Sequence, residues 1–239
     1  MDSKLKVIFV SPCYNAEKNI EKLIDSIRSQ NDSRWNHVII DDISTDNTYE
    51  VAQKYTQDDS RFTVIRNSEK KYALRNIIEA SRDFSSKQNI IATVDGDDSL
   101  CNNDAVSKLI QCYVAGKDVV WTAHKWDING MNISRTMPEN VNPYQWPWCS
   151  SHLRTFRSSL LDKIKDSNFK DWRGQWFKRG YDQALMLPIL SLTKNRYFLN
   201  DVCYKYNIES VSLPAAQRDK CERDQISTVN FVRARGFVS

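Results

Sequence analysis

The sequence predicts an α/β fold in which a mostly parallel sheet is covered by helices on both faces. Short apolar, β-branched runs recur roughly every 25 to 30 residues through the first half of the chain. Between these runs, apolar residues follow the i, i+3, i+4, i+7 spacing of a one-sided helix. Strands that alternate with helices in this way form βαβ units, and such units build parallel sheets.

Five strands are expected in this first half, within residues 5–10, 37–40, 62–65, 89–94 and 118–122. Helical periods follow the first four strands, within residues 20–27, 51–55, 73–80 and 105–110. After about residue 125 the pattern is lost, and residues 129–150 are polar and rich in turn formers. Beyond them we expect helices at 153–164 and 182–192 and a strand at 197–206, and we assign no role to the charged tail, 215–239.

Length and composition limit the class of protein. The chain has 239 residues, which suits one large domain, and it has no low-complexity tract. A net charge of +4 spread along the chain does not form the basic stripe that binds nucleic acid. The six cysteines lack any C-x-x-C pair, so we expect free thiols in a reducing compartment, the cytoplasm. The apolar run after Lys6 is about four residues long, too short for a signal peptide or a membrane span of ~20 residues.

Acidic residues gather at one place in the predicted sheet, immediately after strands. Asp95-Gly96-Asp97-Asp98 follows the fourth strand, and ligands of open α/β sheets bind outside the carboxyl ends of strands. Three carboxylates so close together repel one another, and a hard divalent cation such as Mg²⁺ or Mn²⁺ would relieve the repulsion. The alternative is an acidic cap for the helix after Cys101. We expect Gly96 to allow a tight turn and a close approach to a ligand.

The second strand also ends in acids. Asp42 is expected to accept hydrogen bonds from a ligand, whereas Ser44 or Asp46 is expected to cap the following helix. With only six glycines, the chain has neither a G-x-G-x-x-G nor a G-x-x-x-x-G-K loop. The absence of both loops argues against a dehydrogenase and a P-loop NTPase, and a phosphate would have to be held through metal.

Four motifs in order resemble the nucleotide-binding half of the family 2 glycosyltransferases of the GT-A fold. They are S-P-C-Y-N-A-E, I-I-D-D-I-S-T-D-N-T, A-L-R-N-I-I-E-A and T-V-D-G-D-D. The resemblance implies that the donor nucleotide contacts Pro12, Tyr14, Glu17 and Asp42, that Arg75 contacts the donor, and that Asp95 faces the ribose. It implies that Mn²⁺ or Mg²⁺ is held by Asp97 and, with it, Asp98.

The second half of the chain is matched less closely. Gly180-Tyr181-Asp182-Gln183 resembles the site of the family's general base, with Tyr181 in place of the first acid of the usual pair, which leaves Asp182 as the base. His152 and Arg154 lie where related enzymes contact the acceptor or the diphosphate, and they flank a predicted helix start, where anions bind. Asn207 stands near the place of a metal-binding histidine.

The resemblance implies an enzyme that transfers a sugar, with inversion, from a nucleotide diphosphate donor to an acceptor hydroxyl. UDP is the expected nucleotide, and the acceptor is a saccharide or another hydroxyl-bearing molecule. Residues 1–125 would form the nucleotide-sugar-binding half and 126–214 the acceptor and catalytic half of one domain. Two alternatives stay open: a sugar-1-phosphate nucleotidyltransferase, although its glycine-rich first loop is missing, and a non-catalytic nucleotide- or carbohydrate-binding module.

Overall fold

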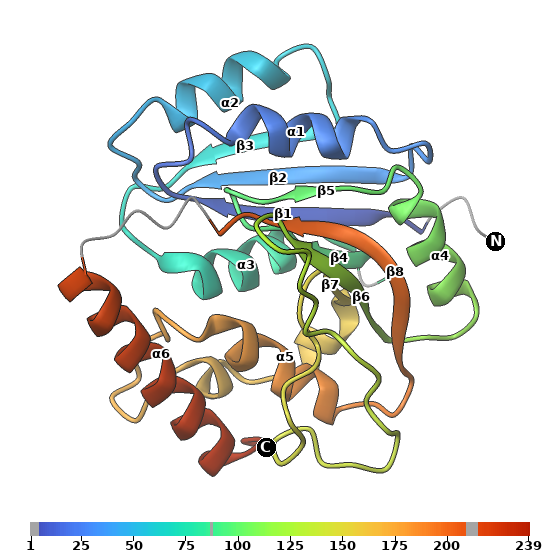
Figure 1. The fold of residues 1–239 in the computed structure, drawn as a ribbon, viewed down its shortest axis with the longest axis vertical. Coiled ribbons are helices and arrows are strands. Elements are labelled where there is room, and N and C mark those ends of the chain that lie inside the picture. Colours follow the sequence, from blue (N-terminus) through green and yellow to red (C-terminus); the bar gives the residue numbers. More distant parts are fainter. Residues whose placement is uncertain (1–4, 87, 209–214) are drawn as a thin grey trace.

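One eight-stranded sheet organises the computed structural model, which describes residues 5–86, 88–208 and 215–239 (Figure 1). The strand order across the sheet is β3-β2-β1-β4-β7-β6-β8-β5. The strands are β1 (Val7–Cys13), β2 (Trp35–Asp41), β3 (Phe62–Arg66), β4 (Ile90–Thr93), β5 (Ser99–Leu100), β6 (Val119–Trp126), β7 (Arg154–Arg157) and β8 (Arg196–Tyr206).

Most neighbouring strands in this sheet are parallel. β1 pairs in parallel with β2 and β4, β2 with β3, and β6 with β8. β7 runs antiparallel between β4 and β6, and the short β5 runs antiparallel along β8. The predicted α/β fold with a mostly parallel sheet is therefore confirmed.

Helices cover both faces of the sheet, as Figure 1 shows. They are α1 (Ile20–Arg28), α2 (Thr48–Thr56), α3 (Tyr72–Asp83), α4 (Ala105–Val114), α5 (Tyr181–Ser191) and α6 (Ala215–Arg235), with 3-10 turns η2 (Ser158–Lys163) and η3 (Asp166–Phe169). The apolar residues of α1 and α4 join one buried cluster, and those of α3 and α5 join a second cluster. α1, α2 and α4 therefore lie on one face, and α3 and α5 lie on the other.

The first strand shows why both faces are buried. Val7 and Phe9 belong to the cluster under α1 and α4, whereas Ile8 and Val10 belong to the cluster under α3 and α5. Successive side chains of a strand point to opposite faces, so a continuous apolar run supplies both cores at once. All four side chains are buried.

One predicted helix is absent. The structure replaces the expected helix at 153–164 with strand β7 and the 3-10 turn η2. Within β7, Phe156 enters the cluster under α5, while the hydroxyls of Thr155 and Tyr113 lie 2.8 Å apart on the other face. Pairing on both sides, with β4 and β6, buries this short segment in the sheet and overrides its helical spacing.

The charged tail forms helix α6, which packs against α5 without a marked apolar stripe. Arginines hold its C-terminal part: the guanidinium of Arg233 donates to the carbonyls of Tyr144 and Trp146, each at 2.9 Å. Arg235 donates to the carbonyls of Ser167, Asn168 and Lys170. In the described ranges, no helix has both the length and the apolar character needed to cross a bilayer.

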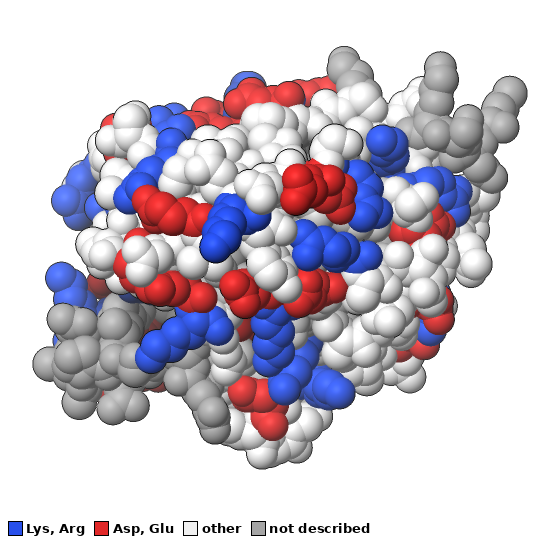
Figure 2. Space-filling model, turned by 90° about the horizontal axis from the view of Figure 1, so that it is seen from above, with Lys and Arg blue, Asp and Glu red and all other residues white. Residues whose placement is uncertain are grey.

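Charges of both signs are mixed on the molecular surface. Figure 2, seen from the side of α1 and α2, shows Lys and Arg interspersed with Asp and Glu. Ion pairs join charges on these helices, such as Arg28 with Asp25 at 3.2 Å on α1 and Arg66 with Glu50 at 2.9 Å beside α2. This face presents no large field of one sign, in keeping with the small net charge.

Candidate functional site

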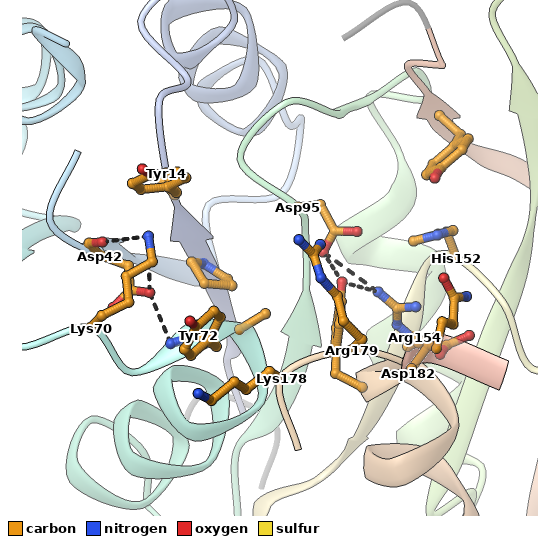
Figure 3. Close-up of a pocket in the computed structure, with 17 residues that line it drawn as sticks. Tyr14, Asp42, Lys70, Tyr72, Asp95, His152, Arg154, Lys178, Arg179 and Asp182 are labelled. Atoms are coloured by element: carbon orange, nitrogen blue, oxygen red, sulfur yellow. Dashed lines mark hydrogen bonds and ion pairs between the residues drawn. The ribbon is translucent and has the colours of Figure 1, made fainter. Parts of the chain in front are cut away.

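Two adjoining cavities open at the carboxyl ends of β1, β2 and β4, where the acidic motifs were expected to meet. The first, of about 420 Å³, is lined by these predicted site residues: Pro12, Tyr14, Asp42, Asp95, His152, Arg154 and Asp182. The second, of about 770 Å³, is lined by Glu17 and Asp97 and shares Pro12, Tyr14 and Asp95 with the first. Figure 3 shows Tyr14, Asp42, Lys70 and Tyr72 on one side of the first cavity and Asp95, Arg154 and Asp182 on the other.

Asp42 is buried at the end of β2, where its carboxylate meets the start of α3. The backbone amides of Lys71 and Tyr72 donate to its two oxygens, each at 2.8 Å, and the side-chain amide of Asn67 donates at 2.8 Å. Burial alone would raise the pKa of Asp42. The hydrogen bonds from Lys71, Asn67 and Tyr72 lower the pKa by more than burial raises it, so it lies below the ordinary value. Asp42 therefore orders the loop before α3 and stays ionised.

An aromatic and cationic wall stands beside Asp42. The ammonium of Lys70 lies 2.9 Å from the ring centroid of Tyr14, and it donates to the Asp42 carbonyl at 2.8 Å. The ammonium of Lys178 lies 5.0 Å from the ring of Tyr72. The Tyr14 side chain is 52% exposed, so its ring is accessible for stacking on a planar group. This wall suits a nucleotide base, which combines a planar face with polar edges.

Gly96 lies in the acidic loop because the chain comes too close there for a side chain. A Cβ at this position would stand 2.7 Å from the sulfur of Cys13 and 3.0 Å from its Cα. The sequence suggested that Gly96 lets the backbone approach a ligand. In the structure, the close approach is to β1, and it fixes the acidic loop against the end of that strand.

Asp98 is buried deeply behind this loop. Its carboxylate accepts a hydrogen bond from the Tyr204 hydroxyl at 2.6 Å and another from the backbone amide of Asn207 at 2.7 Å. Burial, followed by the negative charges of Asp95 and Asp97, raises the pKa of Asp98 well above its ordinary value. A bound cation would reverse the electrostatic part of that shift.

Asp95, at the mouth of the cavity, is held by groups from the second half of the chain. The Tyr181 hydroxyl donates a short hydrogen bond to its carboxylate, and a guanidinium nitrogen of Arg154 lies 3.6 Å from the same oxygen. That nitrogen also donates to the Tyr181 hydroxyl at 3.1 Å, and Arg154 Nε donates to the Thr93 hydroxyl at 3.2 Å. Arg154, only 1% exposed, is thus a fixed positive charge under the acidic rim that Asp95, Asp97 and Asp98 form.

His152 stacks between two tyrosines, with its ring centroid 4.5 Å from that of Tyr204 and 5.1 Å from that of Tyr206. Burial, then the charge of Arg154, lowers its pKa well below the ordinary value, so the imidazole is neutral. Its buried Nδ1 has no hydrogen-bond partner. One ligand atom from each of Asp95, Asp98 and His152 lies within 4.8 Å of the others. This set of two carboxylates and a neutral imidazole with an unsatisfied nitrogen fits a divalent metal ion.

His152 and Arg154 do not flank a helix start, because they lie at and just before β7. The expected anion site at a helix terminus is therefore absent at this point. Their part in the site comes from the sheet instead: β7 lies beside β4, and the register places Arg154 opposite Thr93.

Asp182 lies in the first turn of α5, which begins after Gly180 in the left-handed region, at φ 61°. The side chain is half-buried and borders the first cavity. Burial raises the pKa of Asp182, and the nearby positive charge of Arg154 opposes the rise without cancelling it. A carboxylate whose pKa is raised toward neutrality is suited to accept a proton.

Arg75 is the one predicted contact that the structure does not bring to the site. Its guanidinium pairs with Glu79 at 2.7 Å and with Glu69 at 2.9 Å, and it does not line either cavity. Glu17 lines the second cavity while accepting hydrogen bonds from Asn47.

The sequence did not single out several residues of the site, among them Lys70, Tyr72, Lys178 and Arg179. All four line the first cavity, and Arg179 lines the second as well. They come from the segment before and at the start of α3 and from the segment before α5. The one available sign was the K-R pair immediately before the Gly-Tyr-Asp element, since basic residues close to a predicted base suit an anionic donor.

The fold and this acidic rim define a GT-A protein, and the family follows from comparison with known proteins. The model of the family "Glycosyl transferase family 2" matches residues 8–171, more than half of the chain. The chain therefore belongs to glycosyl transferase family 2, and the resemblance found in the four motifs is confirmed.

Solved structures share the fold. TarS of S. aureus in complex with UDP superposes with a TM-score of 0.67 at 19% identity, over 92% of this chain and 70% of that one. TarS in complex with UDP-GlcNAc gives a TM-score of 0.65 at 19% identity, over 84% and 58% of the two chains. The mannosyltransferase PcManGT of Pyrobaculum calidifontis, in complex with GDP-Man and Mn²⁺, gives 0.61 at 16% identity, over 94% and 64%.

Sequence relatives extend across most of the chain. It is 24% identical to the glycosyltransferase GlyA of Streptococcus pneumoniae over 233 residues, which are 92% of this chain and 33% of GlyA. It is 23% identical to GlyG of the same species over 88% of this chain and 73% of GlyG. The chain spans about a third of the length of GlyA, and shorter matches cover 23% and 35% of two further curated relatives.

Proposed function

We propose that this protein transfers a sugar from a UDP-sugar to an acceptor hydroxyl, with inversion at the anomeric carbon and with a divalent metal ion. The observation that carries the proposal is one continuous site. An aromatic and cationic wall beside Asp42 adjoins an acidic rim at Asp95, and a carboxylate with a raised pKa, Asp182, borders the same cavity. Membership of glycosyl transferase family 2 supports this reaction class.

The donor would lie across the ends of β1, β2 and β4. Tyr14 and Lys70 would contact the base, with Pro12 and Asp42 beside them and Asp95 toward the ribose. Lys178 and Arg179 border the path between the two sides and would neutralise the diphosphate, since guanidinium and ammonium groups bind phosphate oxygens with charge-assisted hydrogen bonds. The bound UDP and UDP-GlcNAc of TarS, which shares the fold, support the choice of nucleotide.

Mn²⁺ or Mg²⁺ would be held by Asp97 and Asp98, and Asp95 and His152 would join Asp98, since one ligand atom from each of these three lies within 4.8 Å of the others. When bound, such an ion supplies Lewis-acid stabilisation of the charge that develops on the leaving diphosphate. The Mn²⁺ in the PcManGT complex supports metal use. Tyr204 and the backbone of Asn207 fix the Asp98 carboxylate, so this ligand is oriented in advance.

Asp182 would remove the proton from the acceptor hydroxyl as its oxygen attacks the anomeric carbon. A single displacement from the face opposite the leaving group inverts the configuration. Tyr181, which stands where relatives have an acid, donates its hydroxyl proton to Asp95 and accepts from Arg154, so it positions the rim and leaves Asp182 as the only carboxylate at the start of α5.

Thermal unfolding with UDP, with and without Mn²⁺, tests the donor site. A ligand that binds only the folded protein stabilises it by about 2.7 kcal/mol at 100 times its Kd, and we expect this stabilisation to require Mn²⁺. Incubation with UDP-sugars and candidate acceptors should then release UDP. Release of pyrophosphate would indicate the nucleotidyltransferase alternative, and metal-independent binding without turnover would indicate the binding module.

A further inference from the structure

A groove of about 450 Å³ lies beside the first cavity of the candidate site, the donor cavity. The segment before α5 forms one wall, with Trp172, Trp176 and Phe177, and α6 forms the other, with Ser227, Thr228 and Phe231. Lys178 and Arg179 line this groove and the donor cavity alike, so the two spaces adjoin at this segment. The groove therefore lies next to the cavity that Asp182 borders.

Trp172 is the most unusual residue of this groove. Its side chain is 74% exposed, the largest exposure among the exposed large apolar residues of the described chain. Burial cannot explain a tryptophan in this position, because most of its ring gains nothing from folding. The guanidinium of Arg173 lies over one face of the ring, 4.6 Å from its centroid, so the opposite face is the one available for a further partner.

The turn that carries Trp172 is ordered by its own hydrogen bonds. The Asp171 carboxylate accepts from the backbone amides of Arg173 at 2.8 Å and Gln175 at 2.9 Å, and Lys170 pairs with Trp176 as an antiparallel bridge. Gly174, at φ 76°, makes the turn possible. A ring held on an ordered turn loses little conformational entropy when a ligand binds.

The lining of the groove combines aromatic rings with short polar side chains. Trp172 and Trp176 offer flat apolar surfaces, and the hydroxyls of Ser227 and Thr228 and the amide of Gln175 offer hydrogen-bond donors and acceptors. A pyranose has the complementary surface: an apolar C–H face for stacking and hydroxyl groups around its edge. The region matched by the family model ends at residue 171, so this wall belongs to the part of the chain that the model does not cover.

We infer that this groove binds the saccharide chain of the acceptor, with sugar rings stacked on Trp172 and the terminal hydroxyl delivered past Lys178 and Arg179 to Asp182. The inference rests on the proposed function. It adds that the acceptor is an oligosaccharide of several sugar units, because the groove extends away from the proposed general base, Asp182, along the 171–179 segment and the facing turns of α6.

Binding of defined tetrasaccharides tests the inference without any turnover. The probes are tetrasaccharides of glucose, N-acetylglucosamine, mannose, galactose and a uronic acid, each compared with its monosaccharide, and saturation-transfer NMR titrations give the affinities. We expect at least one tetrasaccharide to bind more tightly than its monosaccharide. Trp172→Ala should weaken that binding about tenfold, a loss typical of a central aromatic contact. Trp172→Phe should retain most of it.

Phe84→Ala is the matched control, since Phe84 is also an exposed aromatic residue, 41% exposed, at the far end of α3. It should leave saccharide binding unchanged. Failure of every tetrasaccharide to bind at about 10 mM, or equal binding by the wild type and Trp172→Ala, overturns the inference. UDP binding with Mn²⁺ is measured on the same samples, so a protein that binds UDP but no saccharide refutes the groove and leaves the donor site standing.

Discussion

Replacement of Gly96 by alanine probes the contact that fixes the acidic loop. The new Cβ would lie 2.7 Å from Cys13 Sγ, 3.0 Å from its Cα and 3.1 Å from its Cβ, compared with about 3.5–4.0 Å for unstrained carbon contacts. Because two of these atoms cannot move without β1, the loop has to shift. Overpacking of this kind costs about 1–3 kcal/mol. For a chain of this size, a cost of about 2 kcal/mol lowers Tm by about 4–8 °C.

Urea unfolding gives the free energy of unfolding, and calorimetric titration gives the affinity for UDP in the presence of Mn²⁺. Gly96→Ala should lose stability and, because Asp95, Asp97 and Asp98 move with the loop, should also bind UDP more weakly. Adding Cys13→Ala removes the closest contact, that with the sulfur, and should restore about 1 kcal/mol relative to the sum of the single variants. A Gly96→Ala protein within about 0.5 kcal/mol of the wild type, with unchanged UDP affinity, would refute the steric argument.

Three further predictions concern the carboxylates. Asp42→Asn should lose about 2 kcal/mol of stability in urea unfolding near pH 7, because two charged hydrogen bonds from backbone amides become neutral and one of the amides then faces an NH₂ group. The pKa of Asp42 is lowered in the folded protein. The stability that the Asp42 carboxylate contributes is therefore present above about pH 4 and should vanish as the pH falls through the folded pKa. Asp182→Asn should reduce kcat by about 10²- to 10⁴-fold. Because burial raises the pKa of Asp182, the kcat of the wild type should decrease toward acid pH with a midpoint above the ordinary Asp pKa of about 3.9. Asp98→Asn should be at least as stable as the wild type in EDTA, because burial beside two like charges already disfavours its ionised form, yet should lose the Mn²⁺-dependent stabilisation by UDP.

The sequence was enough to predict the site residues that come together because their strands run in the same direction. Asp42 and Asp95 follow parallel neighbours of β1, and carboxyl ends of parallel strands share one edge, so periodicity and spacing were enough to bring them together. The antiparallel β7 was not predicted, because a four-residue strand gains its stability from partners on both sides.

Other parts of the site depend on contacts that leave no local pattern. Lys70 and Lys178 reach the cavity from loops whose paths are set by tertiary packing. α6 lacked a readable apolar period because arginines such as Arg233 fasten it to backbone carbonyls, an interaction that hydrophobic spacing does not record.

The tyrosine at position 181 makes physical sense in terms of the charges around it. Asp95, Asp97 and Asp98 already crowd the rim, and the buried Arg154 lies 3.6 Å from Asp95. A carboxylate at position 181 would face Asp95 with a like charge, whereas the hydroxyl of Tyr181 donates to it and accepts from Arg154. The charge of Asp95 is therefore compensated before any metal binds. It follows that Tyr181 does not argue against catalysis: a tyrosine here avoids a repulsion beside Asp95 and leaves the proposed proton acceptor, Asp182, one residue further along the same helical turn.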